Sequence, residues 1–319
     1  MTAPAVRVAI LDDVERVALS CADWRSLGAD EVVALERHVE GTELAGLLAG
    51  FDVLVVQRER TRMTGDLLDA LPSVRLIVTT GVRNASIDLD ACAARGVVVC
   101  STGGTQSPVV EHAWALILAA LRDVPSRDAS MRRGEWQPTA GRALEGRTLG
   151  LLGLGKTGTR MARIGTAFGL DVVAWSENLT AEAAVERGAR RVEKDELFSA
   201  SDIVSVHQML SPRSRGLVGE RELRLMRPDA WLVNTSRGPV VDEAALVRAL
   251  DEGWIAGAAL DVFDDEPLPA DHPLRSSPRT VLTPHVGYVT LDNYRDWYTT
   301  AVARIQAWAD GHPEGVLTP

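Results

Sequence analysis

The chain has almost no lysine: Lys156 and Lys194 are its only ones, so arginine supplies nearly all of the 34 basic side chains. Acidic residues number 44, and the formal net charge is −10 at pH 7. A nucleic-acid surface needs concentrated positive charge, and this balance argues against one. A protein this acidic binds an anionic ligand only where basic groups or backbone N–H groups gather locally.

Cysteine and long apolar runs are also scarce. Cys21, Cys92 and Cys100 have neither metal-ligand spacing nor a C-x-x-C pair. We therefore expect small buried hydrophobic side chains in a reducing compartment, with no metal site. No apolar run approaches the ~18 residues of a membrane helix, and the start MTAPAVRVAIL has no signal-peptide pattern. The expectation is a cytoplasmic protein without membrane contact.

The composition that is present is typical of a globular α/β protein. The 319 residues, 46% hydrophobic and 24% charged, are enough for two domains. Short β-branched runs alternate with helical patterns, as in parallel sheets. The expected strands are 6–11, 32–35, 53–56, 76–80 and 97–99, and then a second set that starts at 148 and continues at 171–175, 203–206, 231–234, 258–260 and 281–283. A helix over 108–122 capped by Ser107, and a closing amphipathic helix over 291–310, complete the pattern.

A glycine-rich turn follows the first strand of the second set. Gly153, Gly155 and Gly158 are spaced G-x-G-x-x-G between an apolar strand and a helix. The first glycine permits a tight turn, the second lets the backbone approach a pyrophosphate, and the third lets helix pack on strand. The helix N-terminus then faces the phosphates. The pattern predicts dinucleotide binding; a purely structural turn is the alternative.

The acidic residue that usually contacts the ribose is displaced here. Ser176 stands where an aspartate is common at the end of the second strand, and Glu177 follows it. No arginine follows directly to hold a 2′-phosphate, and Glu177 would repel one. The sequence favours NAD over NADP, although NADP stays open and Glu177 facing only solvent is an equal alternative.

A polar cluster follows the expected strand 231–234. Its residues 234–238 read Asn-Thr-Ser-Arg-Gly, and Arg237 has forked donors that suit a carboxylate and a carbonyl oxygen. Because carboxyl ends of parallel strands border the ligand crevice, we expect Arg237 to bind substrate. A surface arginine is the alternative.

Two further clusters follow the last two expected strands. Residues 260–267, LDVFDDEP, are acidic, and residues 283–287, TPHVG, contain His285. A lone histidine is more often structural, and an acidic run is usually a solvated loop. His285 is nevertheless the best acid–base candidate of the six histidines, and Glu266 is its natural partner, since a carboxylate helps imidazole keep its proton.

Between the two strand sets lies an arginine- and glycine-rich segment, 132–147, with Trp136 inside it. A surface linker is the plain interpretation. An arm packed on a second subunit, with Trp136 as its anchor, is the alternative that we favour.

The stretches GLLGLGKTG, VNTSRGPVVDE, GAALDVFDDEP and TPHVG, in this order, resemble the D-isomer-specific 2-hydroxyacid dehydrogenase family over essentially the whole chain. The resemblance implies an α/β fold of two doubly wound parallel-sheet domains. A Rossmann-type NAD(P) domain, 101–288, is nested in a discontinuous flavodoxin-like substrate domain, 1–100 and 289–319. A homodimer is also implied.

The resemblance also implies residue roles. Arg237 would bind and polarise the substrate, Glu266 would orient His285, and His285 would shuttle the proton. Lys156 and Thr157 would offer N–H groups to the pyrophosphate, His207 would lie near the adenosine half, and Asp261 near the nicotinamide. The implied cofactor contacts are Gly153, Gly155, Lys156, Thr157, Gly158, Ser176, Glu177, His207, Thr235, Asp261 and Gly287. The implied substrate contacts are Val82, Arg83 and Arg237.

Three residues depart from the family pattern: Arg83 replaces a small residue, Tyr288 stands where small residues are usual, and Ser176 replaces an aspartate. The expected activity is hydride transfer between NAD(H) and a small 2-keto or 2-hydroxy acid. A formate dehydrogenase would pair its histidine with glutamine, so Glu266 argues against one. An NAD-sensing interaction protein of the co-repressor type is the alternative from another class.

Overall fold

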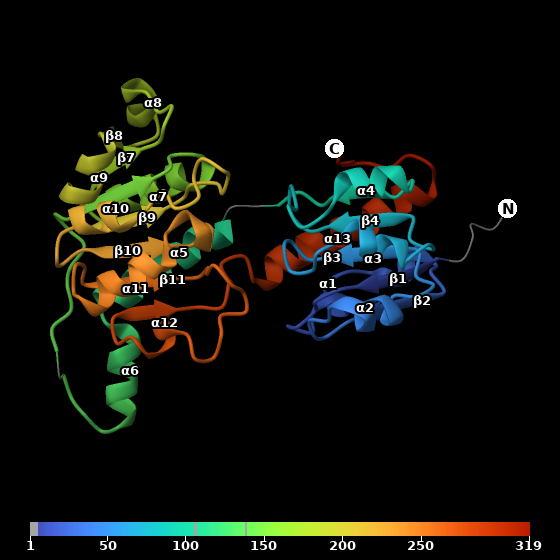
Figure 1. Cartoon of the computed structure of the whole chain (residues 1–319), viewed down its shortest axis with the longest axis horizontal. Helices are drawn as coiled ribbons and strands as arrows, with labels where there is room; N and C mark the ends of the chain where they lie inside the picture. The colour runs from blue at the N-terminus through green and yellow to red at the C-terminus, as the bar shows by residue number, and fades with distance from the viewer. Residues whose placement is uncertain (1–5, 105–106, 138) are drawn as a thin grey trace. The chain divides into compact units, whose positions relative to one another are not determined.

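The computed structural model describes residues 6–104, 107–137 and 139–319. These residues form two compact units. Unit 1 comprises the described residues of 1–105 together with 289–319, and unit 2 comprises those of 106–288. Each unit is a parallel sheet with helices packed against it (Figure 1).

Unit 1 is built on a five-stranded sheet in the order β2-β1-β3-β4-β5, with every pairing parallel. Its strands are β1 (Arg7–Ile10), β2 (Glu31–Ala34), β3 (Val53–Val56), β4 (Leu76–Thr79) and β5 (Val98–Ser101). The three central strands are fully buried apart from Arg7, as strands covered on both faces must be. This strand order is that of the flavodoxin-like fold, which confirms the predicted class for this unit.

Helices cover both faces of that sheet. Their bounds are α1 (Ala18–Cys21), η1 (Trp24–Leu27, a 3-10 helix), α2 (Gly41–Leu47), α3 (Gly65–Asp69), α4 (Leu89–Ala94) and α13 (Leu291–Ala309). α13 packs on β4, α1 and η1, so the last helix belongs to the first unit. Its buried face carries Tyr294, Trp297 and Tyr298, and Tyr298 stacks on Tyr294 at 5.8 Å between ring centroids.

Unit 2 is built on a seven-stranded parallel sheet in the order β12-β11-β10-β9-β6-β7-β8. Its strands are β6 (Thr148–Leu152), β7 (Asp171–Trp175), β8 (Arg190–Arg191), β9 (Ile203–Val206), β10 (Trp231–Asn234), β11 (Gly257–Leu260) and β12 (Thr280–Leu282). Counted from β6, the order reads 3-2-1-4-5-6 with one added strand, which is the Rossmann arrangement. The order reverses between β6 and β9, and the ligand crevice of such sheets lies there.

The strands of this sheet contribute side chains to two separate hydrophobic cores. Alternate side chains of one strand, such as Val173 and Val172, belong to different hydrophobic clusters. One cluster is closed by α5 and α7, and the other by α9, α10 and α11. The helices of unit 2 are α5 (Ser107–Leu121), α6 (Val124–Arg132), α7 (Lys156–Ala167), α8 (Ala181–Glu186), α9 (Lys194–Ala200), α10 (Glu220–Leu225), η2 (Gly238–Val240, a 3-10 helix), α11 (Glu243–Asp251) and α12 (Pro273–Ser276).

Local details differ from the sequence expectations at a few points. Helix α5 begins at Ser107, so this residue is its first helical residue rather than its N-cap, and the Ser107 hydroxyl donates to Glu111 at 3.0 Å. Strand β8 was not expected, because Arg190 and Arg191 carry no apolar pattern; it forms because its backbone pairs with β7. The expected burial of the three cysteines is confirmed: all three are buried free thiols, and burial raises the pKa of the Cys92 thiol to about 11.

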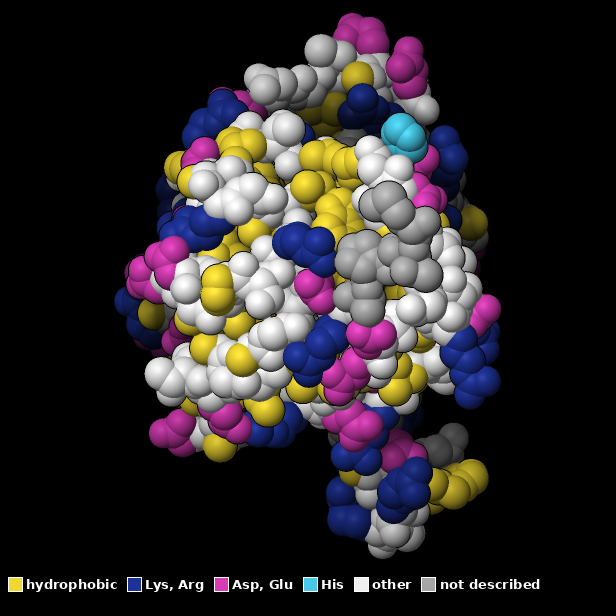
Figure 2. Space-filling view, turned by 90° about the vertical axis from the view of Figure 1, so that its right-hand side faces the viewer, with side chains coloured by type: hydrophobic (Ala, Val, Ile, Leu, Met, Phe, Trp, Pro, Cys, Tyr) yellow, Lys and Arg dark blue, Asp and Glu magenta, His cyan; other side chains and the backbone are white. Residues whose placement is uncertain are grey.

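The surface carries charges of both signs. On the face drawn in Figure 2, arginine and lysine side chains are interspersed with aspartate and glutamate. Trp136, in the segment that follows α6, is 75% exposed. Among the described residues, no helix is both long and apolar enough to cross a membrane.

Candidate functional site

The glycine turn after β6 has a shape that larger residues would break. Gly153 has φ +102°, and a Cβ there would lie 2.7 Å from the carbonyl oxygen of His207. A Cβ on Gly158 would lie 2.2 Å from the carbonyl oxygen of Gly153. Gly155 differs, because no atom of the described residues lies within 4 Å of its Cβ position. Two glycines therefore permit close backbone packing, and the third borders open space.

That open space lies at the N-terminus of α7. Gly155 is the N-cap, and Lys156 is the exposed first residue of the helix, followed by half-buried Thr157. The first N–H groups of a helix have no partner inside the helix and attract anions. The turn therefore fits a pyrophosphate group.

A second feature also fits a bound cofactor. Thr235 follows β10 and is 7% exposed, and its hydroxyl has no hydrogen-bond partner among the described residues. A buried hydroxyl without a partner is rare in folded proteins, since the lost solvation has to be replaced. The Thr235 hydroxyl thus has hydrogen-bonding capacity that the described residues leave unused.

The end of β7 is tied to the glycine turn. The Leu154 N–H donates to the Ser176 hydroxyl at 3.2 Å, while Glu177 is exposed. Arg187, at the C-cap of α8, donates from Nη1 to the Leu154 carbonyl oxygen at 2.9 Å. No local pattern in the sequence indicates this contact, because Arg187 lies well beyond the residues that directly follow β7. Ser176 therefore supports the turn as well as standing at the expected ribose position.

His207 follows β9, across the switch point from the glycine turn. Its Nε2 lies 2.9 Å from the Ser205 hydroxyl, and its backbone N–H donates to the Leu152 carbonyl oxygen. Burial lowers the pKa of His207 to about 4. The imidazole is therefore neutral at physiological pH and packs beside the turn without adding charge.

The loop after β10 holds Arg237 by hydrogen bonds to its backbone. The Asn234 amide donates to the Arg237 carbonyl oxygen at 2.9 Å, and its Oδ1 accepts from the Ser236 N–H at 3.0 Å. The Arg237 Nη1 donates to the Ser236 carbonyl oxygen at 2.6 Å. A Cβ on Gly238 would lie 2.0 Å from the Phe263 carbonyl carbon. The arginine loop is therefore packed directly against the loop after β11.

The loops after β11 and β12 meet at an imidazole–carboxylate pair. His285 Nδ1 lies 2.5 Å from Glu266 Oε2, and both side chains are about one-third exposed or less. The other oxygen, Oε1, accepts from the Phe263 N–H at 2.9 Å, which fixes the carboxylate. Because Nδ1 is occupied, Nε2 is the ring nitrogen that can exchange a proton. Tyr288 meets the imidazole edge-on, with ring centroids 5.7 Å apart.

Asp261 anchors the loop that carries His285. It is 1% exposed, and its carboxylate accepts from the N–H groups of Val286 at 2.9 Å and Gly287 at 2.8 Å. Burial alone would raise the pKa of Asp261, but the nearby His112 and the hydrogen bonds from Thr283 and the backbone outweigh it, and the net pKa is lowered. The carboxylate therefore stays ionised.

The expected substrate loop belongs to unit 1 and follows β4. Val82 is 55% exposed, and Arg83 is exposed beside it. Asn84 is buried and fixes the loop, donating to the Thr79 hydroxyl and accepting from the Ser86 N–H, each at 3.0 Å. Arg58 packs on the same loop, with its Cδ 3.2 Å from the Cβ position of Gly81. Sequence reasoning missed Arg58, although its place two residues after β3 is the same kind of signal that identified Arg237.

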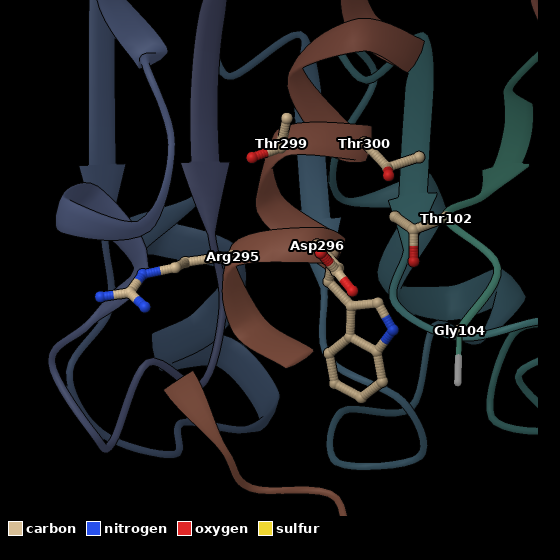
Figure 3. Close-up of a pocket in the computed structure, with 7 residues that line it drawn as sticks. Thr102, Gly104, Arg295, Asp296, Thr299 and Thr300 are labelled. Atoms are coloured by element: carbon tan, nitrogen blue, oxygen red, sulfur yellow. The ribbon is translucent and has the colours of Figure 1, made fainter. Parts of the chain in front are cut away.

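A pocket of about 430 Å³ lies close to this loop in unit 1 (Figure 3). It is lined by residues of α13 and of the segment after β5: Thr102, Gly104, Arg295, Asp296, Trp297, Thr299 and Thr300. The Cβ position of Gly104 is 3.8 Å from the Gly81 Cα, so the pocket adjoins the base of the 81–84 loop. In Figure 3 the Arg295 side chain extends away from Thr102 and Gly104.

Unit 2 therefore brings together most of the residues that the sequence singled out. The glycine turn, His207, Thr235, Arg237, Asp261 and His285 follow β6, β9, β10, β11 and β12 at one edge of a parallel sheet. Val82 and Arg83 stand at the same kind of edge in unit 1. Among the described residues, no three His, Cys, Asp or Glu side chains are grouped to hold a metal ion.

Several characterised proteins are similar to this chain in sequence. Glyoxylate reductase of Aeropyrum pernix is 40% identical over 260 residues, covering 78% of each chain. D-3-phosphoglycerate dehydrogenase of Bacillus subtilis is 35% identical over 288 residues, covering 89% of this chain and 54% of its own length.

Solved structures and a family model agree with these similarities. A phosphoglycerate oxidoreductase from Vibrio cholerae superposes with a TM-score of 0.91 at 35% identity, covering 96% of this chain and 99% of that one. The family model of the NAD-binding domain of D-isomer specific 2-hydroxyacid dehydrogenases matches residues 114–287, which contain the glycine turn, Arg237 and the His285–Glu266 pair. The chain belongs to the D-isomer specific 2-hydroxyacid dehydrogenase family.

Proposed function

We propose that this protein transfers a hydride reversibly between NAD(H) and a 2-keto or D-2-hydroxy acid. The observation that carries the proposal is the 2.5 Å contact between His285 Nδ1 and Glu266 Oε2. The loop that bears Glu266 packs against the loop that bears Arg237. This arrangement offers a proton donor and a forked cation at one sheet edge, which is what reduction of a keto acid requires.

The cofactor is held, in this proposal, along the carboxyl edge of unit 2. Gly153, Gly155 and Gly158 shape the turn, and the first N–H groups of α7, from Lys156 and Thr157, bind the pyrophosphate. The other proposed contacts are Ser176, Glu177, His207, Thr235, Asp261 and Gly287. When bound, the nicotinamide ring supplies the hydride in reduction and accepts it in oxidation.

Arg237 binds and polarises the substrate. Its guanidinium presents parallel donors that suit the carboxylate and carbonyl oxygens of a keto acid. The cation stabilises the negative charge that develops on the carbonyl oxygen. The hydrogen bonds from Asn234 and Ser236 support this role, because they fix the backbone from which Arg237 extends.

His285 donates the proton to that oxygen from Nε2 in reduction and takes it back in oxidation. Glu266 orients the ring by its contact with Nδ1 and stabilises the imidazolium. Asp261 keeps the loop in place, since its carboxylate accepts from two consecutive backbone N–H groups.

Unit 1 is proposed to supply substrate selectivity through Val82 and Arg83, with unit 2 as the NAD(P) domain. Relatives are named for glyoxylate and for 3-phosphoglycerate, so the keto acid itself is left to experiment. We also propose a homodimer, in which the segment 132–147 packs on a second subunit through exposed Trp136.

NADH is the proposed preferred cofactor, because the exposed Glu177 carboxylate would repel a 2′-phosphate. Replacing Glu177→Arg reverses that charge and should shift the NADPH/NADH ratio of kcat/KM upward by about tenfold. Steady-state kinetics with both cofactors measures the ratio. A wild-type preference for NADPH would contradict the assignment, and Glu182→Arg, on α8, serves as a charge-matched control.

The function itself is tested with a panel of 2-keto acids, glyoxylate, hydroxypyruvate, pyruvate and 3-phosphohydroxypyruvate, each with NADH and NADPH. Reduction of at least one acid, lost in Arg237→Ala, supports the proposal. Tight NADH binding without turnover on the panel would instead favour an NAD-sensing interaction protein.

A further inference from the structure

Helix α5 contributes a histidine to the base of the loop that carries His285. His112 Nε2 lies 2.9 Å from the Thr283 hydroxyl and 3.3 Å from Asp261 Oδ1. The side chain of His112 is 20% exposed and that of Asp261 only 2%. His112 takes no part in the proposed reaction.

The hydrogen bonds among these three side chains have a defined direction. The Thr283 hydroxyl lies 2.6 Å from Asp261 Oδ1, and an ionised carboxylate only accepts, so the hydroxyl donates there. The Thr283 oxygen then accepts from the N–H at His112 Nε2. Protons are thus directed from His112 through Thr283 to Asp261, and Nε2 is the protonated nitrogen of His112.

Asp261 also holds the backbone of the loop that carries His285. Its Oδ1 accepts from the Val286 N–H and its Oδ2 from the Gly287 N–H. His285 lies between Thr283 and Val286 and has φ +54°, a left-handed conformation that non-glycine residues seldom adopt. Both flanks of a strained residue are therefore tied to the same carboxylate.

We propose that His112 is a positioning residue: acting through Thr283 and Asp261, it holds the 283–287 loop so that His285 keeps its contact with Glu266. Its consequence for turnover rests on the proposed function, whereas its consequence for the environment of His285 does not. No role in proton transfer is assigned to His112, because its Nε2–H is committed to Thr283.

Two substitutions at His112 separate positioning from mere packing. His112→Leu removes the donor, and His112→Gln keeps an N–H near the same place. A small displacement of a catalytic group lowers turnover strongly, so His112→Leu should lower kcat by about 10-fold or more, while the Kd for NADH stays within about twofold. His112→Gln should restore most of kcat.

A core variant at the opposite edge of the sheet is the matched control. Val192 is 3% exposed and follows β8, whereas the loop of His285 follows β12, the edge strand at the other end. Val192→Ala should lower the melting temperature without lowering kcat. If it lowers kcat as much as His112→Leu does, the effect of His112 is general destabilisation and the proposal is overturned.

A second readout does not depend on turnover. The His285 Cε1–Hε1 resonance, assigned by its loss in a His285→Asn sample, reports the surroundings of the imidazole. It should move in His112→Leu and lie near its wild-type position in His112→Gln. If His112→Leu does not fold, Thr283→Val and Thr283→Ser make the same comparison, with the hydroxyl removed or kept.

The outcomes separate the two proposals. If wild type reduces no keto acid, the proposed function fails, and the His285 resonance still decides the positioning role. If wild type is active but His112→Leu leaves both kcat and that resonance unchanged, the positioning role is wrong.

Discussion

The loops that follow the strands are held more firmly in unit 2 than in unit 1. In unit 2 Asp261 and Glu266 join the loop after β11 to the loop after β12. The loop after β10 is fixed internally by Asn234 and packs against Phe263. In unit 1 the loop after β4 is fixed at its base by Asn84, and its tip residues Val82 and Arg83 are exposed.

This difference separates two tasks. Proton transfer and charge stabilisation need side chains held within a fraction of an ångström, and buried carboxylates and amides provide that order. Choosing among keto acids needs side chains that can change without disturbing the chemistry, and an exposed loop tip allows this. Variants in unit 2 should therefore change rate, and variants at the tip in unit 1 should change selectivity.

The largest effect is expected at Arg237. Arg237→Ala removes both the substrate contact and the charge that stabilises the developing alkoxide, so kcat/KM should fall by about 10³-fold or more. Arg237→Lys should restore little, because a single ammonium does not reproduce the forked donors. Steady-state kinetics measures both, and near-normal kcat/KM in Arg237→Ala would refute the role.

A smaller loss is expected at Glu266. Glu266→Gln keeps the shape but removes the charge beside His285, so kcat should fall by about 10²-fold while the Kd for NADH is unchanged. Asp265→Asn, at the exposed neighbouring position, is the matched control and should have little effect. Equal losses in the two variants would show that Glu266 has no special link to the catalytic proton.

The buried His207 should make the stability of the protein depend on pH. Its pKa is about 4 in the folded protein and about 6.5 in the unfolded chain, so between these values the unfolded chain takes up a proton that the folded protein does not. Stability should therefore fall as the pH drops below 6.5, by about 1–2 kcal/mol between pH 7 and pH 5.

The comparison uses thermal unfolding of wild type and His207→Gln at both pH values. Wild type should lose a few °C more than the variant between pH 7 and pH 5, because the variant lacks the titrating group. Equal losses in the two proteins would mean that His207 is not held in its neutral form.

The smallest effect is expected at the tip of the unit 1 loop. Arg83→Ala should raise KM for a preferred keto acid by about fivefold and leave kcat nearly unchanged, since an exposed ion pair contributes at most about 1 kcal/mol. Measuring KM and kcat across the keto-acid panel tests this. A fall in kcat with unchanged KM would contradict the assignment of selectivity to unit 1 and of rate to unit 2.

Much of the fold and site followed from local patterns. Fully buried parallel strands read as short β-branched runs, so most strands were predicted to within two residues. Gly153 and Gly158 have contacts that only glycine permits, which is why their spacing was informative. The rule that ligands bind at carboxyl ends of strands selected Arg237 and His285. Asp261 was named only by the family resemblance.

What the sequence missed depends on contacts between distant segments. Strand β8 exists only through pairing with β7, since Arg190 and Arg191 carry no strand pattern. His112 sits within a mostly apolar helix, where periodicity reveals a buried face but not a carboxylate on the facing loop. Arg187 reaches the glycine turn from the end of α8, and no local motif marks such a reach.

In the proposed function, the carboxyl edge of the unit 2 sheet catalyses reversible hydride transfer to a keto acid. The most direct test is to measure the 2-hydroxy acid formed from the keto-acid panel with NADH, and its configuration, for wild type and for His285→Ala. Wild type should reduce at least one acid and form the D-isomer wherever the product is chiral, glycolate from glyoxylate being achiral. His285→Ala should form product about 10³-fold more slowly. An L-product, no product from wild type, or an unchanged rate in His285→Ala would overturn the proposed function.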